Sequence, residues 1–162
     1  MGGDDVAQYN LARYYYYGIG VERDFGLAVE WFTRSAKQGN PDAQYRLGSC
    51  YYYGIGVEQN YNIAVDWFKK TAEQGNIDAL CLLGNSYQLG QGVAQNYAAA
   101  VDCFRKAAEQ GSVKAQCLLA YCYQTGQGVE RNMEKAVEWY QKAAIQGDDY
   151  AFQKLRELGY NK

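Results

Sequence analysis

The sequence of this 162-residue chain repeats every 36 residues. Residues 7–42 align without a gap on residues 43–78, and 21 of the 36 aligned positions are identical. The register continues through 79–114 and 115–150, and a partial unit follows at 151–162. A fixed period of this length is typical of stacked repeats, in which each unit buries its apolar face against its neighbours. We therefore expect a repeat architecture.

Each period carries the signals of two helices. A glycine stands at the offset where the second helix should end, and a residue that favours the N-cap position follows it directly. These signals predict that the first helix of each unit begins near residues 5, 41, 77, 113 and 149. The glycines are Gly39, Gly75, Gly111 and Gly147, and the capping residues are Asn40, Asn76, Ser112 and Asp148.

A Gly-x-Gly-Val segment lies in the middle of each unit, as in Gly54-Ile55-Gly56-Val57. A phosphate-binding loop would place its glycines between a strand and a helix, with further glycine or lysine at set spacing. No strand is expected here and no such lysine follows, so we interpret the segment as the turn between two helices. The second helix then begins after another N-cap residue. These N-cap residues are Asp24, Asn60, Asn96 and Asn132.

The repeated pattern is A-x-x-x-L-G-x-x-Y-x-x-G-x-G-V followed by N/D-x-x-x-A-V-x-W-F-x-K-A-A-x-Q-G. It resembles the Sel-one-like repeat (SLR) family, a 36-residue relative of the tetratricopeptide repeat. The resemblance implies an all-α fold, a right-handed α–α superhelix (solenoid) of antiparallel helix hairpins. It also implies a scaffold or adaptor for protein–protein interaction, often in bacteria. We expect one solenoid domain over residues 1–162, with repeats at 5–40, 41–76, 77–112 and 113–148 and a C-terminal capping helix at 149–162.

The third unit departs from this pattern at one apolar position. Cys103 stands where the other units have Trp31, Trp67 and Trp139. Replacing a large core side chain with a small one costs about 2–5 kcal/mol. We therefore predict that the third unit is the least stable part of the array.

The cysteine pattern favours free thiols. The chain has five cysteines, so at least one is unpaired, and none forms a C-x-x-C pair. A cysteine-rich branch of the SLR family bridges the two helices of each repeat, but units one and five here have no cysteine. We expect reduced thiols in a cytoplasmic protein, with an incidental disulfide as the alternative. A secreted or periplasmic location remains open if a native leader was removed.

Composition argues against several functions. The formal charge of −2 and the pI near 5.2 do not favour nucleic-acid binding. No segment approaches the ~20 apolar residues of a transmembrane helix. The chain has no histidine, the commonest general base and metal ligand. We expect no cofactor, no metal and no enzymatic activity. A hydrolase or penicillin-binding protein, as reported for some cysteine-rich relatives, is disfavoured because no Ser-x-x-Lys motif occurs.

The second helix of each unit carries an acid followed four residues later by a base, which predicts a solvated outer surface with weak ion pairs. The four pairs are Glu30 and Arg34, Asp66 and Lys70, Asp102 and Lys106, and Glu138 and Lys142.

The first helix of each unit carries a second stripe beside its apolar face, and this stripe varies between units. In tetratricopeptide relatives the same offsets line a concave groove, so the resemblance implies that they bind a protein or peptide here. Tyrosine suits such a wall because its rigid ring offers contact area and its hydroxyl can donate or accept. The predicted partner-binding residues are Tyr9, Arg13, Tyr16, Tyr17, Tyr45, Ser49, Tyr52, Tyr53, Asn85, Gln88, Tyr121 and Gln124.

Two alternatives to groove binding stay open. The tyrosines could serve packing between repeats, with no ligand. The chain could also be a structural or self-assembling fragment of a longer repeat protein. We expect a monomer or a weak end-to-end oligomer.

Overall fold

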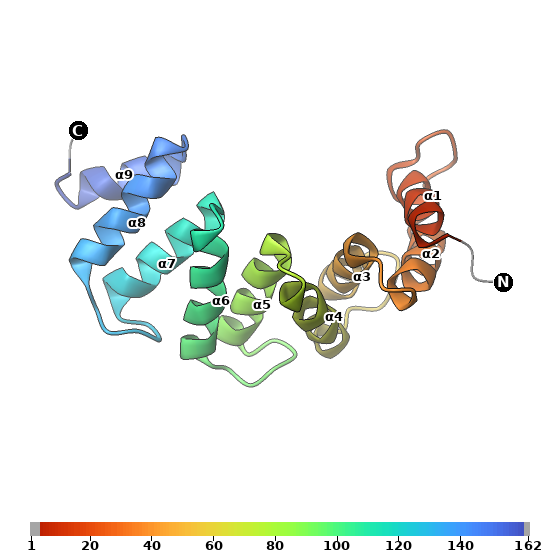
Figure 1. The fold of residues 1–162 in the computed structure, drawn as a ribbon, viewed down its shortest axis with the longest axis horizontal. Coiled ribbons are helices and arrows are strands. Elements are labelled where there is room, and N and C mark those ends of the chain that lie inside the picture. Colours follow the sequence, from red (N-terminus) through yellow and green to blue (C-terminus); the bar gives the residue numbers. More distant parts are fainter. Residues whose placement is uncertain (1–3, 161–162) are drawn as a thin grey trace. The chain divides into compact units, whose positions relative to one another are not determined.

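The computed structural model describes residues 4–160, and within these residues the secondary structure is entirely helical (Figure 1). Helices near 13 residues alternate with short turns, and the first helix of each unit begins where its caps predicted. The helices are α1 (Asp5–Tyr17), α2 (Phe25–Lys37), α3 (Pro41–Tyr53), α4 (Tyr61–Glu73), α5 (Ile77–Leu89), α6 (Tyr97–Glu109), α7 (Val113–Thr125), α8 (Met133–Ile145) and α9 (Asp149–Glu157). The chain is an all-α repeat solenoid, as the sequence predicted.

The capping predictions are confirmed at both kinds of helix start. The Asn40 side chain accepts from the Ala43 amide at 2.9 Å, and the Asn60 side chain accepts from the Ile63 amide at 3.1 Å. Each cap satisfies one of the backbone donors that a helix start leaves without an intrahelical partner. The periodic Asn, Asp and Ser residues therefore fix where each helix begins.

The turn inside each hairpin is closed by the same backbone bond in all four repeats. In the second repeat the Asn60 amide donates to the Tyr51 carbonyl at 2.9 Å, across the Gly-x-Gly segment. Gly54 ends α3 with φ +68°, a left-handed conformation that side chains with a Cβ rarely adopt. The corresponding donors and acceptors elsewhere are Asp24 and Tyr15, Asn96 and Tyr87, and Asn132 and Tyr123.

The second glycine of the turn also lets neighbouring repeats approach closely. A Cβ built on Gly56 would lie 2.3 Å from the backbone oxygen of Phe25, in the preceding repeat. Gly92 meets Tyr61 in the same way, at 2.2 Å. At Gly20 nothing lies within 4 Å of the added Cβ. Gly56 and Gly92 are therefore both turn residues and contacts between repeats, whereas Gly20 is a turn residue alone.

The described chain divides into two compact units. Unit 1 comprises the described residues up to Ala79 with Gln91–Val93, and unit 2 comprises Leu80–Gly90 with the described residues from Ala94 onward. In unit 1, helices α1 to α4 pack in sequence order. Each unit has its own core of alanine, branched and aromatic side chains. Among the fully buried residues are Phe32, Leu47 and Phe68 in unit 1 and Phe104, Leu119 and Tyr140 in unit 2.

The predicted outer surface is exposed, but its predicted ion pairs are absent. Arg34 and Lys70 do not reach the acids four residues before them in the described structure. Their charged groups instead lie 4.4 Å and 4.6 Å from the ring centres of Trp31 and Trp67. A cation over an indole face contributes about 0.5–1 kcal/mol at exposed sites. The indole three residues earlier offers an apolar surface that the methylene groups of the Arg or Lys side chain can cover. This contact is more favourable than an ion pair with a solvated carboxylate, which contributes little.

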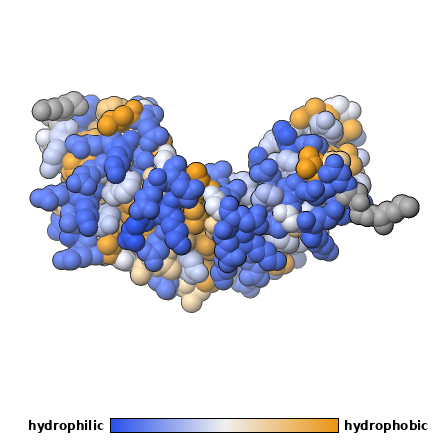
Figure 2. All heavy atoms as spheres, in the orientation of Figure 1, coloured by the Kyte–Doolittle hydropathy of each residue, from blue (hydrophilic) through white to orange (hydrophobic). Residues whose placement is uncertain are grey.

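The remaining exposed surface is mostly polar on the face shown in Figure 2, where hydrophobic residues lie in separate patches. The C-terminal helix α9 ends at Glu157, so it is shorter than the predicted 149–162 segment, whose last two residues lie outside the described residues. At the other end, Ala7 is exposed, whereas its equivalent Ala43 is fully buried. The difference arises because the helices that precede α3 cover Ala43, and no described helix precedes α1.

Candidate functional site

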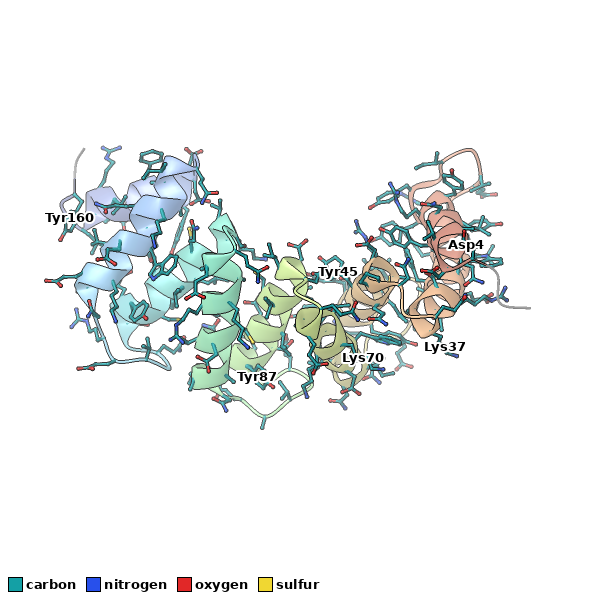
Figure 3. All side chains as sticks on the ribbon, in the orientation of Figure 1. Asp4, Lys37, Tyr45, Lys70, Tyr87 and Tyr160 are labelled. Atoms are coloured by element: carbon teal, nitrogen blue, oxygen red, sulfur yellow. The ribbon has the colours of Figure 1, made fainter. Side chains whose placement is uncertain are left out.

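The predicted binding residues of the first two repeats lie on α1 and α3, both in unit 1. We call this set the α1–α3 tyrosine surface, and it comprises Tyr9, Arg13, Tyr16, Tyr17, Tyr45, Ser49, Tyr52 and Tyr53. Helices α3 and α4 form the hairpin of the second repeat. Figure 3 labels Tyr45 on α3 and Lys70 on α4, and the two labelled residues lie at opposite edges of that hairpin in the view shown.

Four of the six tyrosines of this surface pack against the hairpin that carries them. The rings of Tyr9 and Tyr16 lie 5.9 Å and 6.1 Å from the ring of Phe32 on α2. In the next repeat, the rings of Tyr45 and Tyr52 lie 6.5 Å and 5.9 Å from the ring of Phe68 on α4. Ring pairs at these separations contribute about 0.5–1.5 kcal/mol beyond simple burial. These four half-buried tyrosines therefore support the fold as well as line a surface.

The other two tyrosines of the surface face solvent. Tyr17 is 48% exposed and Tyr53 is 56% exposed. Each sits edge-on against the tyrosine before it, at 5.0 Å from Tyr16 and 4.9 Å from Tyr52. The pairing holds the exposed rings in place through a half-buried neighbour. A partner would therefore meet two rings whose positions the fold has already set.

Arg46 is a residue of this surface that the sequence analysis missed. It lies on α3, half-buried, with its guanidinium 5.9 Å from the ring centre of Tyr45. It also lies within hydrogen-bonding reach of the Tyr9 hydroxyl on α1. Burial lowers the pKa of Arg46, but the phenols of Tyr17 and Tyr9 outweigh that effect, so the net pKa is raised. The signal in the sequence was a charged residue at an offset that is otherwise Asn10, Leu82 and Leu118.

The half-buried hydroxyls stay protonated at neutral pH. Burial raises the pKa of Tyr16, Tyr45 and Tyr52 above the ordinary phenol value. A protonated phenol can both donate and accept a hydrogen bond. The chemistry of this surface is therefore recognition through rings, hydroxyls and guanidinium groups.

One predicted position connects the second repeat to the third and the third repeat to the fourth. The Tyr52 hydroxyl donates to the Gln91 side-chain oxygen at 2.8 Å, within unit 1. Thirty-six residues later, the Gln88 side-chain nitrogen donates to the Gln127 oxygen at 2.9 Å, within unit 2. Gln91 and Gln127 are the middle residues of the Gly-x-Gly turns. Tyr52 and Gln88 thus hold the following turn.

The other predicted residues lie on α5 and α7 in unit 2, and Ser49 of the α1–α3 tyrosine surface bonds within its own helix. Ser49 donates to the Tyr45 carbonyl within its own helix at 2.9 Å. Gln124 accepts from the hydroxyl of the fully buried Tyr140 at 3.1 Å. Asn85 is half-buried and Tyr121 is exposed, both in unit 2. The predicted set is therefore divided between α1 and α3 in unit 1 and positions on α5 and α7 in unit 2.

Two hollows lie elsewhere, at equivalent places in the second and fourth repeats. Each is formed where the Gly-x-Gly turn leads into the second helix, and their volumes are about 330 Å³ and 350 Å³. Tyr51 and Asn60 line the first, and their equivalents Tyr123 and Asn132 line the second. Because the hairpin itself repeats these residues, the hollows follow from its construction.

The cysteines are poorly suited to nucleophilic chemistry. All five are buried. Burial raises the pKa of Cys50 to about 11, and burial together with a bond to Asp148 raises the pKa of Cys117 to about 12. The thiolate is the reactive form. At neutral pH these thiols therefore act as small apolar side chains.

The described residues contain no group of three or more Cys, Asp or Glu side chains placed to hold a metal ion. Every buried side-chain nitrogen or oxygen among them has a hydrogen-bond partner. None of their helices has the length and hydropathy needed to cross a bilayer.

Comparison with known proteins decides the family. The Sel1 repeat family model matches residues 5–40, 41–76, 77–112 and 113–148. The chain belongs to the Sel1 repeat family. The repeat units that its 36-residue period defined are therefore Sel1 repeats, and the SLR resemblance is confirmed. A sel1-like repeat-containing protein of Acanthamoeba polyphaga mimivirus is 47% identical over 38 residues, which are 24% of this chain and 6% of that protein.

Two solved structures resemble this Sel1 repeat chain over most of its length. One is a protective antigen present in uropathogenic Escherichia coli strains, which displays an SLR fold. It is 41% identical, with a TM-score of 0.92 over 94% of this chain and 33% of that chain. The other is a Sel1 repeat protein from Oxalobacter formigenes, 32% identical, with a TM-score of 0.85 over 91% of this chain and 60% of that chain.

Helicobacter pylori cysteine-rich protein B shares the fold at 21% identity, with a TM-score of 0.64 over 85% of this chain and 99% of that one. The chain spans about a third of the E. coli antigen, 6% of the mimivirus protein and 60% of the O. formigenes protein.

Proposed function

We propose that this Sel1 repeat protein is a non-enzymatic scaffold that binds an extended segment of another protein on the α1–α3 tyrosine surface. The observation that carries the proposal is the pair of exposed, pre-positioned rings Tyr17 and Tyr53 on a frame whose caps and turns repeat almost unchanged. In repeat proteins the frame is shared and the binding surface is what varies between units. Rigid aromatic anchors of this kind dominate many protein interfaces.

The half-buried tyrosines cannot test this proposal cleanly. Removing Tyr16 or Tyr52 would also remove ring contacts with Phe32 or Phe68 and the bond to Gln91. A loss of binding would then be indistinguishable from a loss of fold. The exposed rings are the better target.

The test is affinity capture from the native lysate with the intact protein and with the Tyr17→Ala/Tyr53→Ala double variant. Tyr14→Ala is the matched control, because Tyr14 is 47% exposed on α1 but lies outside the surface. We expect a partner that the intact protein and the control retain and the double variant loses. Helical circular dichroism should be the same for all three. A partner retained equally by the double variant would refute the assignment of the surface.

End-to-end self-association is a second candidate function. On α1, Ala7 is exposed, whereas its equivalents Ala43, Ala79 and Ala115, each in a repeat that follows another, are fully buried. Light scattering across a concentration series would test it. A mass that stays at 18.3 kDa at every concentration would exclude this candidate.

A further inference from the structure

Arg46 is a half-buried cation with no anionic partner in the described structure. Its guanidinium is stacked near Tyr45 and reaches the Tyr9 hydroxyl, but no carboxylate of the described residues lies within ion-pair distance of it. A guanidinium carries five N–H donors in a planar fork. One phenol oxygen uses only part of that capacity, so Arg46 retains donors for an incoming acceptor.

Arg13 places a second guanidinium on the same tyrosine. It is exposed on α1, and its guanidinium carbon lies 5.8 Å from the ring centre of Tyr9. It also lacks a carboxylate partner among the described residues. Arg13 thus meets the face of the Tyr9 ring while Arg46 meets its hydroxyl. The Tyr9 side chain therefore lies beside two guanidinium groups that have no carboxylate partner among the described residues.

Among the described residues, no acid of the neighbouring elements forms an ion pair with Arg13 or Arg46. On α1, one Asp5 oxygen accepts from the Asn40 side chain at 2.9 Å. Asp42 is exposed in the first turn of α3, a full turn before Arg46. Asp78 lies near Tyr45 and raises the pKa of that phenol. None of these carboxylates neutralises the two arginines.

We propose that the segment bound on this surface is acidic, and that an Asp or Glu side chain of the partner binds between Arg13 and Arg46. Guanidinium groups bind carboxylates through paired, charge-assisted hydrogen bonds. Half-burial of Arg46 limits the competition from water and salt that weakens exposed ion pairs. Neighbouring residues of the segment would then lie against Tyr17 and Tyr53. This inference rests on the proposed function, because it assigns the charge of the partner at the same surface.

The test is selection from a phage-displayed library of random 12-residue peptides on three proteins. These are the intact chain, the Arg13→Gln/Arg46→Gln double variant, and the Arg34→Gln control. Arg34 is the matched control because it is also an arginine over an aromatic ring, but on the outer surface of α2. Circular dichroism and the thermal midpoint should first show that all three are folded. Peptides selected on the intact chain are then synthesised with each acid changed to its amide.

We expect peptides enriched in Asp and Glu on the intact chain and on Arg34→Gln, and no such enrichment on Arg13→Gln/Arg46→Gln. The amide form of a selected peptide should bind the intact chain about 10-fold more weakly, the loss of one charged hydrogen bond. The double variant should bind the acid and amide forms equally.

Selected peptides without excess acid that still require Tyr17 and Tyr53 would overturn this inference and leave the proposed function standing. Failure to select any peptide that depends on those two tyrosines would count against both. A phosphopeptide that outcompetes the acidic peptides at the same arginines would replace the carboxylate with phosphate and would also overturn the proposal.

Discussion

The contact of Gly56 with the preceding repeat gives the sharpest test of how these repeats are joined. Gly20 and Gly56 occupy the same offset and nearly the same backbone conformation, with φ of +72° and +70°. Alanine at either site pays the left-handed strain of an L-residue, about 1–2 kcal/mol. Only at Gly56 would the new Cβ meet backbone, 2.3 Å from the oxygen and 2.5 Å from the carbon of Phe25.

The added cost at Gly56 follows from that geometry. Ordinary contact distances begin near 3.4 Å, so the second repeat would have to move away from Phe25 by about 1 Å, or the turn would have to distort. Overpacking of this kind typically costs about 1–3 kcal/mol. We therefore expect Gly20→Ala to lower the free energy of unfolding by about 1–2 kcal/mol. Gly56→Ala should lower it by about 2–5 kcal/mol, the sum of strain and overpacking.

Urea unfolding followed by far-UV circular dichroism measures the difference, and amide exchange locates it. The extra loss in Gly56→Ala should accelerate exchange in α1 and α2, because stability in a repeat array depends on nearest-neighbour interfaces. Equal destabilisation by the two substitutions would refute the reasoning, since it would mean that the close approach to Phe25 carries no energetic weight.

Three further predictions concern other contacts. Tyr52→Phe removes the hydroxyl that bonds Gln91, so it should lower the free energy of unfolding in urea by about 0.5–1.5 kcal/mol. Tyr53→Phe, at an exposed ring, should leave that free energy almost unchanged, and equal losses would contradict the role of Tyr52 in linking repeats. Helix α6, with Cys103 in place of tryptophan, should exchange its amides faster than α4 and α8, and slower exchange there would show that the third repeat is not weak. Because burial raises the pKa of Cys50 from 9.0 to about 11, its contribution to stability is full below pH 9 and lost as the pH rises through 11. The urea concentration at the unfolding midpoint should therefore decrease as the pH rises from 9 to 11, and it should decrease by less in Cys50→Ala.

Much of the fold was predictable because its signals are local. Asn60 caps α4 through an amide three residues away, and Gly54 ends α3 through its own φ angle. Each of these choices depends on the chain within one helical turn, so reading the residue types in order was sufficient. Repetition strengthened the signal, because the same residues recur at the same offset in every unit.

Which residues of the predicted stripe are exposed was not predictable from the sequence. The sequence marked adjacent tyrosines such as Tyr16 and Tyr17 as one stripe, yet the first packs against Phe25 and Phe32 and the second faces solvent. Arg46 was missed because its offset is neutral or apolar in the other units, and only the approach of α1 places it beside Tyr9. The predicted Glu30–Arg34 ion pair was wrong because the nearer indole face competes for the same cation.

By itself, the sequence determined that this chain forms capped helix hairpins of 36 residues, because caps, turn glycines and apolar periodicity act over a few residues. Tertiary structure decided which side chains of those hairpins are free to bind. A ring one position along a helix points about 100° away, and whether it is covered depends on which neighbouring helix lies there. For that reason Tyr17 and Tyr53 face solvent, whereas Arg46 is half-buried near Tyr9.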